Sequence, residues 1–224
     1  TWDDSSAARY PGARGATEVG ALATPHATVE ELYLLQKLVR GLGSDNVDFR
    51  LRQSDFSADG AMQGAPWLGM PVAEISDLNS VLLVGTSLRA DHPLLALRLR
   101  QAANRGASVS LINPLDDDLL MPIAAKAIVS PADMANTLEQ VRRALAGEPA
   151  ESAALAIAAA LKTGERKAVL LGNLAQHHPR SAELHALARQ IAELCGAKLG
   201  FLGEAANSVG GYLALAVPQA GGKN

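Results

Sequence analysis

The sequence predicts an α/β fold in which a mostly parallel sheet lies between two layers of helices, a three-layer αβα arrangement. Short, continuously apolar runs recur along the chain, as in strands buried on both faces, and segments of helical periodicity separate them. The composition is 48% hydrophobic but only 4% aromatic, which suits helices packed on a sheet of aliphatic strands. This pattern leaves open the order of the strands and a division of the domain into two lobes.

Composition divides the chain into an arm, a domain and a tail. Residues 1–17 are polar and lack periodicity, so we expect a linker or disordered arm there. Residues 18–202 carry the predicted α/β domain, and residues 203–224 form a glycine-rich stretch that we expect to be an irregular tail. The chain opens with an acidic Thr1-Trp2-Asp3-Asp4 segment instead of a methionine or a basic signal sequence. We therefore expect both ends to have been cut from a longer protein.

The first helix has the clearest start signal in the sequence. A short strand is predicted at Glu18–Ala23, and Thr28 with Glu31 then forms a capping box, in which each side chain bonds the backbone N–H of the other residue. Gly43 ends the helix. The apolar positions that give this helix its periodicity are Leu32, Leu35, Leu38, Val39 and Leu42.

The other elements are predicted from apolar runs, from proline and aspartate at helix starts, and from glycine at helix ends. Residues 53–71 are rich in Ser, Asp, Gly and Pro, which is typical of an irregular loop. The predicted strands are Val81–Val84, Ala107–Ile112, Lys126–Val129, Ala168–Leu171 and Ala197–Phe201. The predicted helices run from Asp91 and Pro93 to about Arg105, onward from Ser130–Asp133, and from about Ser181 to Leu194.

Charge and cysteine content exclude several classes of function. The net charge is −3 and the basic residues are scattered, so the sequence lacks the basic stripe that nucleic acids require. No apolar stretch reaches the roughly 18 residues of a membrane-spanning helix, so we expect no direct membrane insertion. Cys195 is the single cysteine, which excludes an internal disulfide and any iron–sulfur or zinc site built from several thiolates of this chain.

Ligands of open parallel sheets bind beyond the carboxyl ends of the strands, so the turns there are the candidate site. The candidate cofactor-binding residues are Gly85, Thr86, Asn113 and Asp116, and the turn at Gly172-Asn173-Leu174 belongs to the same edge. Strand-to-helix turns use small polar residues in any case, which is the alternative interpretation. The usual glycine-rich dinucleotide and P-loop fingerprints are missing.

No catalytic residue and no metal site is predicted. Adjacent aspartates splay their carboxylates, so the acidic run at residues 116–118 is expected to be a solvated loop. Ser208 lacks the GxSxG context of a hydrolase nucleophile. Cys195 lies at a helix C-terminus, where the dipole disfavours a thiolate. The five histidines, for which no carboxylate completes a convincing ligand set, are His26, His92, His177, His178 and His185.

Residues 23–55 resemble a signature of the molybdopterin oxidoreductase family, and the similarity continues through residues 74–114 and the later helices, covering nearly the whole chain after residue 17. The resemblance implies a Rossmann-like domain of the molybdopterin oxidoreductase type. The positions that match the signature are Thr28, Glu30, Glu31, Gln36, Lys37, Leu38, Arg40, Asn46, Asp48 and Arg50.

Within the family, the stretches LYLLQKLVRGLG and EAANSVGGYLA are most similar to the branch formed by the large iron–sulfur subunits of NADH–quinone oxidoreductase, respiratory complex I. This resemblance implies a role in passing electrons from NADH towards quinone, through iron–sulfur clusters held by N-terminal sequence that this chain lacks. It also implies other peripheral-arm subunits of complex I as partners, and a location on the cytoplasmic side of the bacterial inner membrane.

Working enzymes of the family hold a molybdenum or tungsten bis-pterin guanine dinucleotide. Where they typically show D-P-R-x-T, this chain has Asn113-Pro114-Leu115-Asp116-Asp117, so the acid, the arginine and the threonine are all replaced. Losing the guanidinium removes the best phosphate partner. The resemblance therefore implies a vestigial cleft and a structural brace. The alternatives are a functional molybdopterin guanine dinucleotide-binding domain, as in formate dehydrogenase, and an unrelated α/β binding module.

Overall fold

The computed structural model describes residues 15, 18–52, 55–57, 59, 64–219 and 222–223. The chain forms two compact units, one of residues 1–52 with 205–224 and one of residues 53–204. These bounds differ from the 18–202 domain expected from the sequence, for which a division into two lobes was left open, because both ends of the chain contribute to the first unit. The expected arm over residues 1–17 lies outside the described residues, apart from Gly15.

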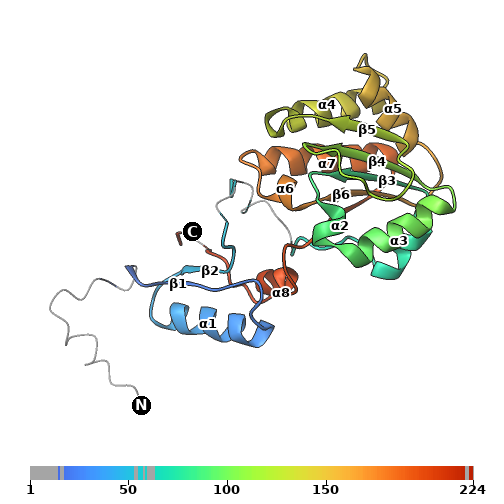
Figure 1. Cartoon of the computed structure of the whole chain (residues 1–224). Helices are drawn as coiled ribbons and strands as arrows, with labels where there is room; N and C mark the ends of the chain where they lie inside the picture. Colours follow the sequence, from blue (N-terminus) through green and yellow to red (C-terminus); the bar gives the residue numbers. More distant parts are fainter. Residues whose placement is uncertain are drawn as a thin grey trace. The chain divides into compact units, whose positions relative to one another are not determined.

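The second unit is built on a five-stranded parallel sheet, which confirms the predicted fold class (Figure 1). The strand order is β5-β4-β3-β6-β7, and each predicted strand is found close to its expected bounds. In register, Val84 of β3 pairs with Ile112 of β4 on one side and with Leu171 of β6 on the other. The strands are β3 (Ser80–Val84), β4 (Ser108–Asn113), β5 (Ala125–Ile128), β6 (Lys167–Leu171) and β7 (Lys198–Phe201).

Helices cover both faces of this sheet, with α4, α5 and α7 on one face and α2 and α3 on the other (Figure 1). Parallel strands require crossover connections, and most of these helices supply them. The helices are η4 (Val72–Asp77), α2 (Leu88–Asp91), α3 (Pro93–Asn104), η5 (Pro131–Asp133), α4 (Met134–Leu145), α5 (Ser152–Leu161), α6 (Asn173–Gln176) and α7 (Ser181–Cys195).

The side chains of the central strands alternate between two cores. Leu82 and Val84 of β3 pack with the helices of one face, whereas Val81 and Leu83 pack with those of the other. All five residues of β3 are buried, as expected for a strand covered on both sides. Continuous apolar runs in the sequence therefore correspond to the middle layer of three.

Helix α5 lies in a segment for which the sequence predicted no element. Its sequence, SAALAIAAAL, is apolar almost throughout, so the polar half of the helical pattern is missing. Alanine has the highest helix propensity, and one side of the helix buries Ala154, Ile157, Ala158 and Leu161. Propensity and burial together explain a helix that periodicity does not reveal.

The first unit contains a small parallel sheet, β1 (Gly20–Leu22) with β2 (Asn46–Asp48), and the helices α1 (Val29–Gly41) and α8 (Ser208–Leu213). The predicted capping box is present at the start of α1. Thr28 Oγ1 accepts a hydrogen bond from the Glu31 amide at 3.2 Å, and the Glu31 carboxylate accepts one from the Thr28 amide at 2.8 Å. Leu32 and Phe49 form the core of this unit with residues of the C-terminal segment.

The expectation of an irregular tail over residues 203–224 is wrong for Ser208–Leu213, which forms α8. The sequence does not predict this helix because it contains Gly210 and Gly211, and glycine is a poor helix former. Both glycines are buried, and a Cβ added at Gly211 would lie 2.6 Å from ring atoms of Phe49. Close packing against the aromatic ring thus requires a residue that helix propensity disfavours.

Candidate functional site

The order of the strands places a topological switch point between β3 and β6. From β3 the chain passes to β4 and β5 on one side, while β6 leads to β7 on the other side. Ligands of open α/β sheets bind at such a point, beyond the carboxyl ends of the strands. Here the switch point brings Gly85 and Thr86, which follow β3, next to Gly172 and Asn173, which follow β6.

Three of the four predicted residues lie together at this edge. The Thr86 amide donates to Asn113 Oδ1 at 3.0 Å, and Asn113 Nδ2 donates to the Leu115 carbonyl oxygen at 2.9 Å. Asn113 is only 1% exposed. Through the oxygen and the nitrogen of its side-chain amide, Asn113 therefore links the turn after β3 to the turn after β4.

Asp116, the fourth predicted residue, is engaged elsewhere. Its carboxylate pairs with the Lys126 ammonium at 2.6 Å, and about half of each side chain is exposed to solvent. The neighbouring Asp118 accepts a hydrogen bond on its carbonyl oxygen from Arg89 at 2.6 Å. Both of these cations thus bond to the acidic loop after β4.

The turns after β3 and β6 pack against each other through their backbones. Gly85 has φ +59°, and a Cβ added there would lie 2.7 Å from the Ala175 nitrogen. A Cβ at Gly172 would overlap Thr86 and the Gly85 carbonyl. That carbonyl accepts a hydrogen bond from the Leu174 amide at 3.0 Å. The Leu174 amide, in the first turn of α6, is consequently used within the chain and is not free for an anion.

Asp91, His92 and Asn173 are polar residues of this edge that were not among the predicted site residues. Asn173 Nδ2 donates to the Asp91 carboxylate at 3.2 Å. Burial lowers the pKa of His92 below its ordinary value, and the negative charge of Asp91 partly opposes this. In the described part of the chain, Thr86 Oγ1, His92 Nε2 and Asn173 Oδ1 are buried without a hydrogen-bond partner. Only the turn of Asn173 carried a signal in the sequence.

His177, His178 and Cys195 have structural surroundings. His178 is buried, its Nε2 lies 2.9 Å from the Pro131 carbonyl oxygen, and its Nδ1 accepts the Arg180 amide. His177 lies 3.3 Å from the Glu204 carboxylate. Burial raises the pKa of the Cys195 thiol. Among the described residues, no group of three or more His, Cys, Asp or Glu side chains is arranged to hold a metal ion.

A depression of about 370 Å³ lies at the opposite, amino ends of β6 and β7. Its charges are mixed, and two of them form an ion pair. Lys198 contacts the Glu74 carboxylate at 2.5 Å, and the Lys167 ammonium donates to the Cys195 carbonyl oxygen at 3.0 Å. Lys167 thereby compensates the C-terminus of α7. This depression is separate from the switch point.

The fold and the switch point define a parallel α/β domain whose candidate ligand edge is bridged by its own backbone. The family model of the molybdopterin oxidoreductases matches residues 9–219. The chain therefore belongs to the molybdopterin oxidoreductase family, as the resemblance in its sequence implied.

Curated relatives come from two branches of oxidoreductases. The G-type subunit of NADH-quinone oxidoreductase from Mycobacterium bovis is 28% identical over 229 aligned residues, which cover 97% of this chain and 26% of that protein. F420-dependent formate dehydrogenase subunit alpha of Methanocaldococcus jannaschii is 29% identical over 101 residues, 43% of this chain and 15% of that protein. The chain thus spans about a quarter or less of the length of these relatives.

A solved structure with a similar fold is the formyltransferase/hydrolase complex of Methylorubrum extorquens in complex with methylofuran. The TM-score is 0.55 at 18% sequence identity, with 81% of this chain and 52% of that chain covered. At this identity the similarity concerns the fold alone. Among the described residues, no helix combines the length and the apolar character needed to cross a membrane.

Proposed function

We propose that this chain is a structural domain of an NADH–quinone oxidoreductase subunit of the G type, with a vestigial cofactor edge. The extent of the similarity supports this proposal, because the alignment with the G-type subunit covers 97% of the chain, whereas that with the formate dehydrogenase subunit covers 43%. The observation that carries the proposal is the closed switch point, where the backbone after β6 bonds directly to the backbone after β3.

The described backbone of this edge is unfavourable for binding a pterin guanine dinucleotide. A dinucleotide approaches a sheet through turns whose backbone amides are free for its phosphates. Here the Leu174 amide donates to Gly85, and the Gly172 amide donates to the Val84 carbonyl oxygen at 2.8 Å. The Asn113 side chain is likewise committed to the turns themselves.

The charge of this edge is also unfavourable for binding the diphosphate of a dinucleotide. The three turns, at residues 85–87, 113–118 and 172–174, contain three aspartates and neither lysine nor arginine. A diphosphate is normally held by a guanidinium or an ammonium. The nearby cations Arg89 and Lys126 both contact the acidic loop. A phosphate placed here would have to compete with these internal partners.

The proposal extends to the setting of the domain. Both curated relatives are subunits by name. In the proposed setting, other peripheral-arm subunits of complex I surround the domain on the cytoplasmic side of the bacterial inner membrane. Iron–sulfur clusters that carry electrons from NADH towards quinone would belong to further sequence of the full subunit. The domain would brace its neighbours and contribute no catalytic group.

The experiment that tests the proposal is metal and pterin analysis of the intact native complex that contains this chain. Mass spectrometry would quantify molybdenum, tungsten and iron, and fluorescence after acid oxidation would quantify pterin. We expect iron without stoichiometric molybdenum, tungsten or pterin in the subunit. One equivalent of metal with pterin assigned to this subunit would contradict the proposal.

A functional pterin-binding domain is the second candidate, because buried polar atoms at the switch point lack partners. The Thr86 hydroxyl, at 1% exposure, and Asn173 Oδ1 are both in this state. Leaving such atoms unpaired costs about 1–3 kcal/mol each, which a ligand would recover. The similarity to a formate dehydrogenase subunit supports the same candidate. Retention of pterin by the native complex would favour it.

A further inference from the structure

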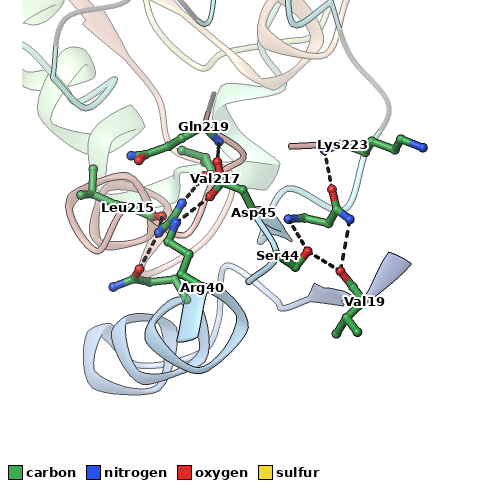
Figure 2. Close-up of polar contacts among 10 residues, drawn as sticks. Val19, Arg40, Ser44, Asp45, Leu215, Val217, Gln219 and Lys223 are labelled. Carbon is green, nitrogen blue, oxygen red and sulfur yellow. Dashed lines mark hydrogen bonds and ion pairs between the residues drawn. The ribbon is translucent and has the colours of Figure 1, made fainter. Parts of the chain in front are cut away.

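The Arg40 guanidinium is the centre of a polar cluster in the first unit (Figure 2). On α1 and the following turn it donates to Gln36 and, at 2.6 Å, to the Asp45 carboxylate. Its other hydrogen bonds reach the far end of the chain, to the carbonyl oxygens of Leu215 at 2.9 Å and Val217 at 3.0 Å. One side chain thus joins segments more than 170 residues apart.

Asp45 and the next residue in the chain, Asn46, bind amides of the same C-terminal stretch. The Asp45 carboxylate accepts a hydrogen bond from the Gln219 amide at 2.9 Å, and Asn46 Oδ1 accepts one from the Lys223 amide at 2.8 Å. Asp45 is therefore shared between a cation and a backbone N–H. We name residues Ala214–Gln219 the strap. Arg40 donates to carbonyl oxygens of the strap, and Asp45 accepts from an amide of the strap, so both side chains bind its main chain (Figure 2).

Apolar packing fixes the other side of the strap. Ala214 is 4% exposed and Ala216 is fully buried, and both join Leu32 and Phe49 in the core of the first unit. Alternate residues of the strap thus present carbonyl oxygens to Arg40 and methyl groups to the core. Small side chains at these two positions let the main chain lie close to Leu32 and Phe49.

The second residue of the strap, Leu215, has a strained conformation. Leu215 has φ +57°, in the left-handed region that favours glycine. It ends α8 in a Schellman motif, in which the Leu215 amide donates to Tyr212 and the Ala216 amide donates to Gly211, each at 3.0 Å. Arg40 bonds the carbonyl of this same residue. Unfavourable backbone geometry persists where surrounding contacts over-determine it, and Arg40 supplies one of those contacts.

We propose that Arg40, with Asp45, is a positioning device that fastens the strap, and that the first unit is complete only when the strap is engaged. Gln36, Arg40 and Asn46 are three of the positions that match the family signature; in this chain the first two belong to the cluster, and Asn46 bonds the Lys223 amide of the same C-terminal stretch. The signature thereby has a structural task, to recognise the returning end of the chain through its main chain. Fastening of the strap does not depend on the proposed electron-transfer setting.

Amide hydrogen exchange of the full-length protein tests the proposal, with Arg40→Ala as the first variant. Loss of the guanidinium leaves the Leu215 and Val217 carbonyl oxygens without their donor and the Asp45 carboxylate without its counter-charge. We expect the amides of Ala216 and Gln219 to exchange at least about tenfold faster, while β3 and β6 of the second unit keep their protection. Arg40→Lys keeps the positive charge but loses the forked geometry of the guanidinium. The strap amides of this variant should exchange at a rate between those of the parent protein and Arg40→Ala.

Arg180→Ala is the matched control, because Arg180 forms an exposed pair with Glu183 in the second unit. It should leave the exchange of the strap unchanged. Should Arg40→Ala fail to fold, Asp45→Asn serves as the second variant, since it removes one charge without changing the shape. Unaltered exchange of the strap in these variants would overturn the proposal, and so would a uniform increase over the whole chain. Leu215→Gly in the Arg40→Ala background should restore part of the protection by relieving the strain.

Discussion

At the scale of single residues, Asn113 shows how a side chain of the candidate edge serves to hold the turns together. Its amide both accepts from the Thr86 N–H and donates to the Leu115 carbonyl oxygen. A carboxylate has two acceptor oxygens and no donor, so it could make only the first of these bonds. An asparagine side chain can make both hydrogen bonds, so the geometry of the two turns favours asparagine over aspartate at this position.

Asn113→Asp should accordingly destabilise the protein by about 1–3 kcal/mol, because a buried carboxylate would face the Leu115 carbonyl oxygen. Urea denaturation at pH 7 measures this change. Asp116→Asn is the control, since its ion pair with Lys126 is half exposed and contributes about 1 kcal/mol or less. Equal stability of Asn113→Asp and the parent protein would show that the bond to Leu115 is not needed.

His185 predicts a pH dependence of stability. Burial, aided by the positive charge of Arg189, lowers the pKa of His185 below its ordinary value of 6.5, and the ring stacks edge-on against Phe201. Near and below pH 6.5 the unfolded chain therefore binds a proton more readily than the folded one, so the free energy of unfolding falls as the pH falls. Between pH 7.5 and 5.5, His185→Gln should lose less stability than the parent protein. If the free energy of unfolding of His185→Gln fell between pH 7.5 and 5.5 by as much as that of the parent protein, this assignment would be wrong.

At the scale of elements, the sequence predicts those helices and strands whose own residues carry a complete local signal, such as a helix cap or a continuous apolar run. The capping box of α1 and the apolar strands of the second unit belong to this group. Helices α5 and α8 and strand β2 do not. Helix α5 lacks a polar face, α8 contains a buried glycine pair, and β2 is a three-residue strand of largely polar sequence. Each is stabilised by other elements that cover it: α4 and the sheet for α5, Phe49 for the glycine pair of α8, and β1 for β2.

Thr28→Ala should destabilise the first unit by about 1 kcal/mol, because it removes the acceptor of the Glu31 amide. Chemical denaturation, with hydrogen exchange of α1 as a local probe, measures the effect. Thr28→Ser keeps the hydroxyl and should stay close to the parent protein. A loss of the same size in Thr28→Ser would place the contribution in the methyl group instead of the cap.

At the scale of the whole molecule, two separate sets of buried residues stabilise the two units. Leu32, Phe49, Ala214 and Ala216 form the core of the first, and none of them belongs to the two cores that cover the sheet of the second. Units with their own cores can unfold as separate cooperative blocks. The first unit is the smaller one, and its core has fewer large side chains.

Phe49→Ala should therefore abolish protection in the first unit, at a cost of about 3–5 kcal/mol, while the second unit stays folded. Ile157→Ala should do the converse, lowering the stability of the second unit by about 2–5 kcal/mol. Hydrogen exchange with mass spectrometry separates the two outcomes. A loss of protection in both units with either variant would mean that the chain unfolds as one block.

The sequence alone determined the α/β class, the parallel strands, the capped first helix and the family, because these depend on local periodicity and on motifs of neighbouring residues. It also placed Gly85, Thr86 and Asn113 at the carboxyl edge, since strand ends are local features. Only the tertiary structure decided that Asp116 turns away to Lys126, that the turns after β3 and β6 bridge each other, and that Arg40 holds the end of the chain. The contacts between the two turns and those of Arg40 join residues far apart in sequence, whereas Asp116 and Lys126 are ten residues apart and meet because β5 lies beside β4. All of them depend on strand order or on packing.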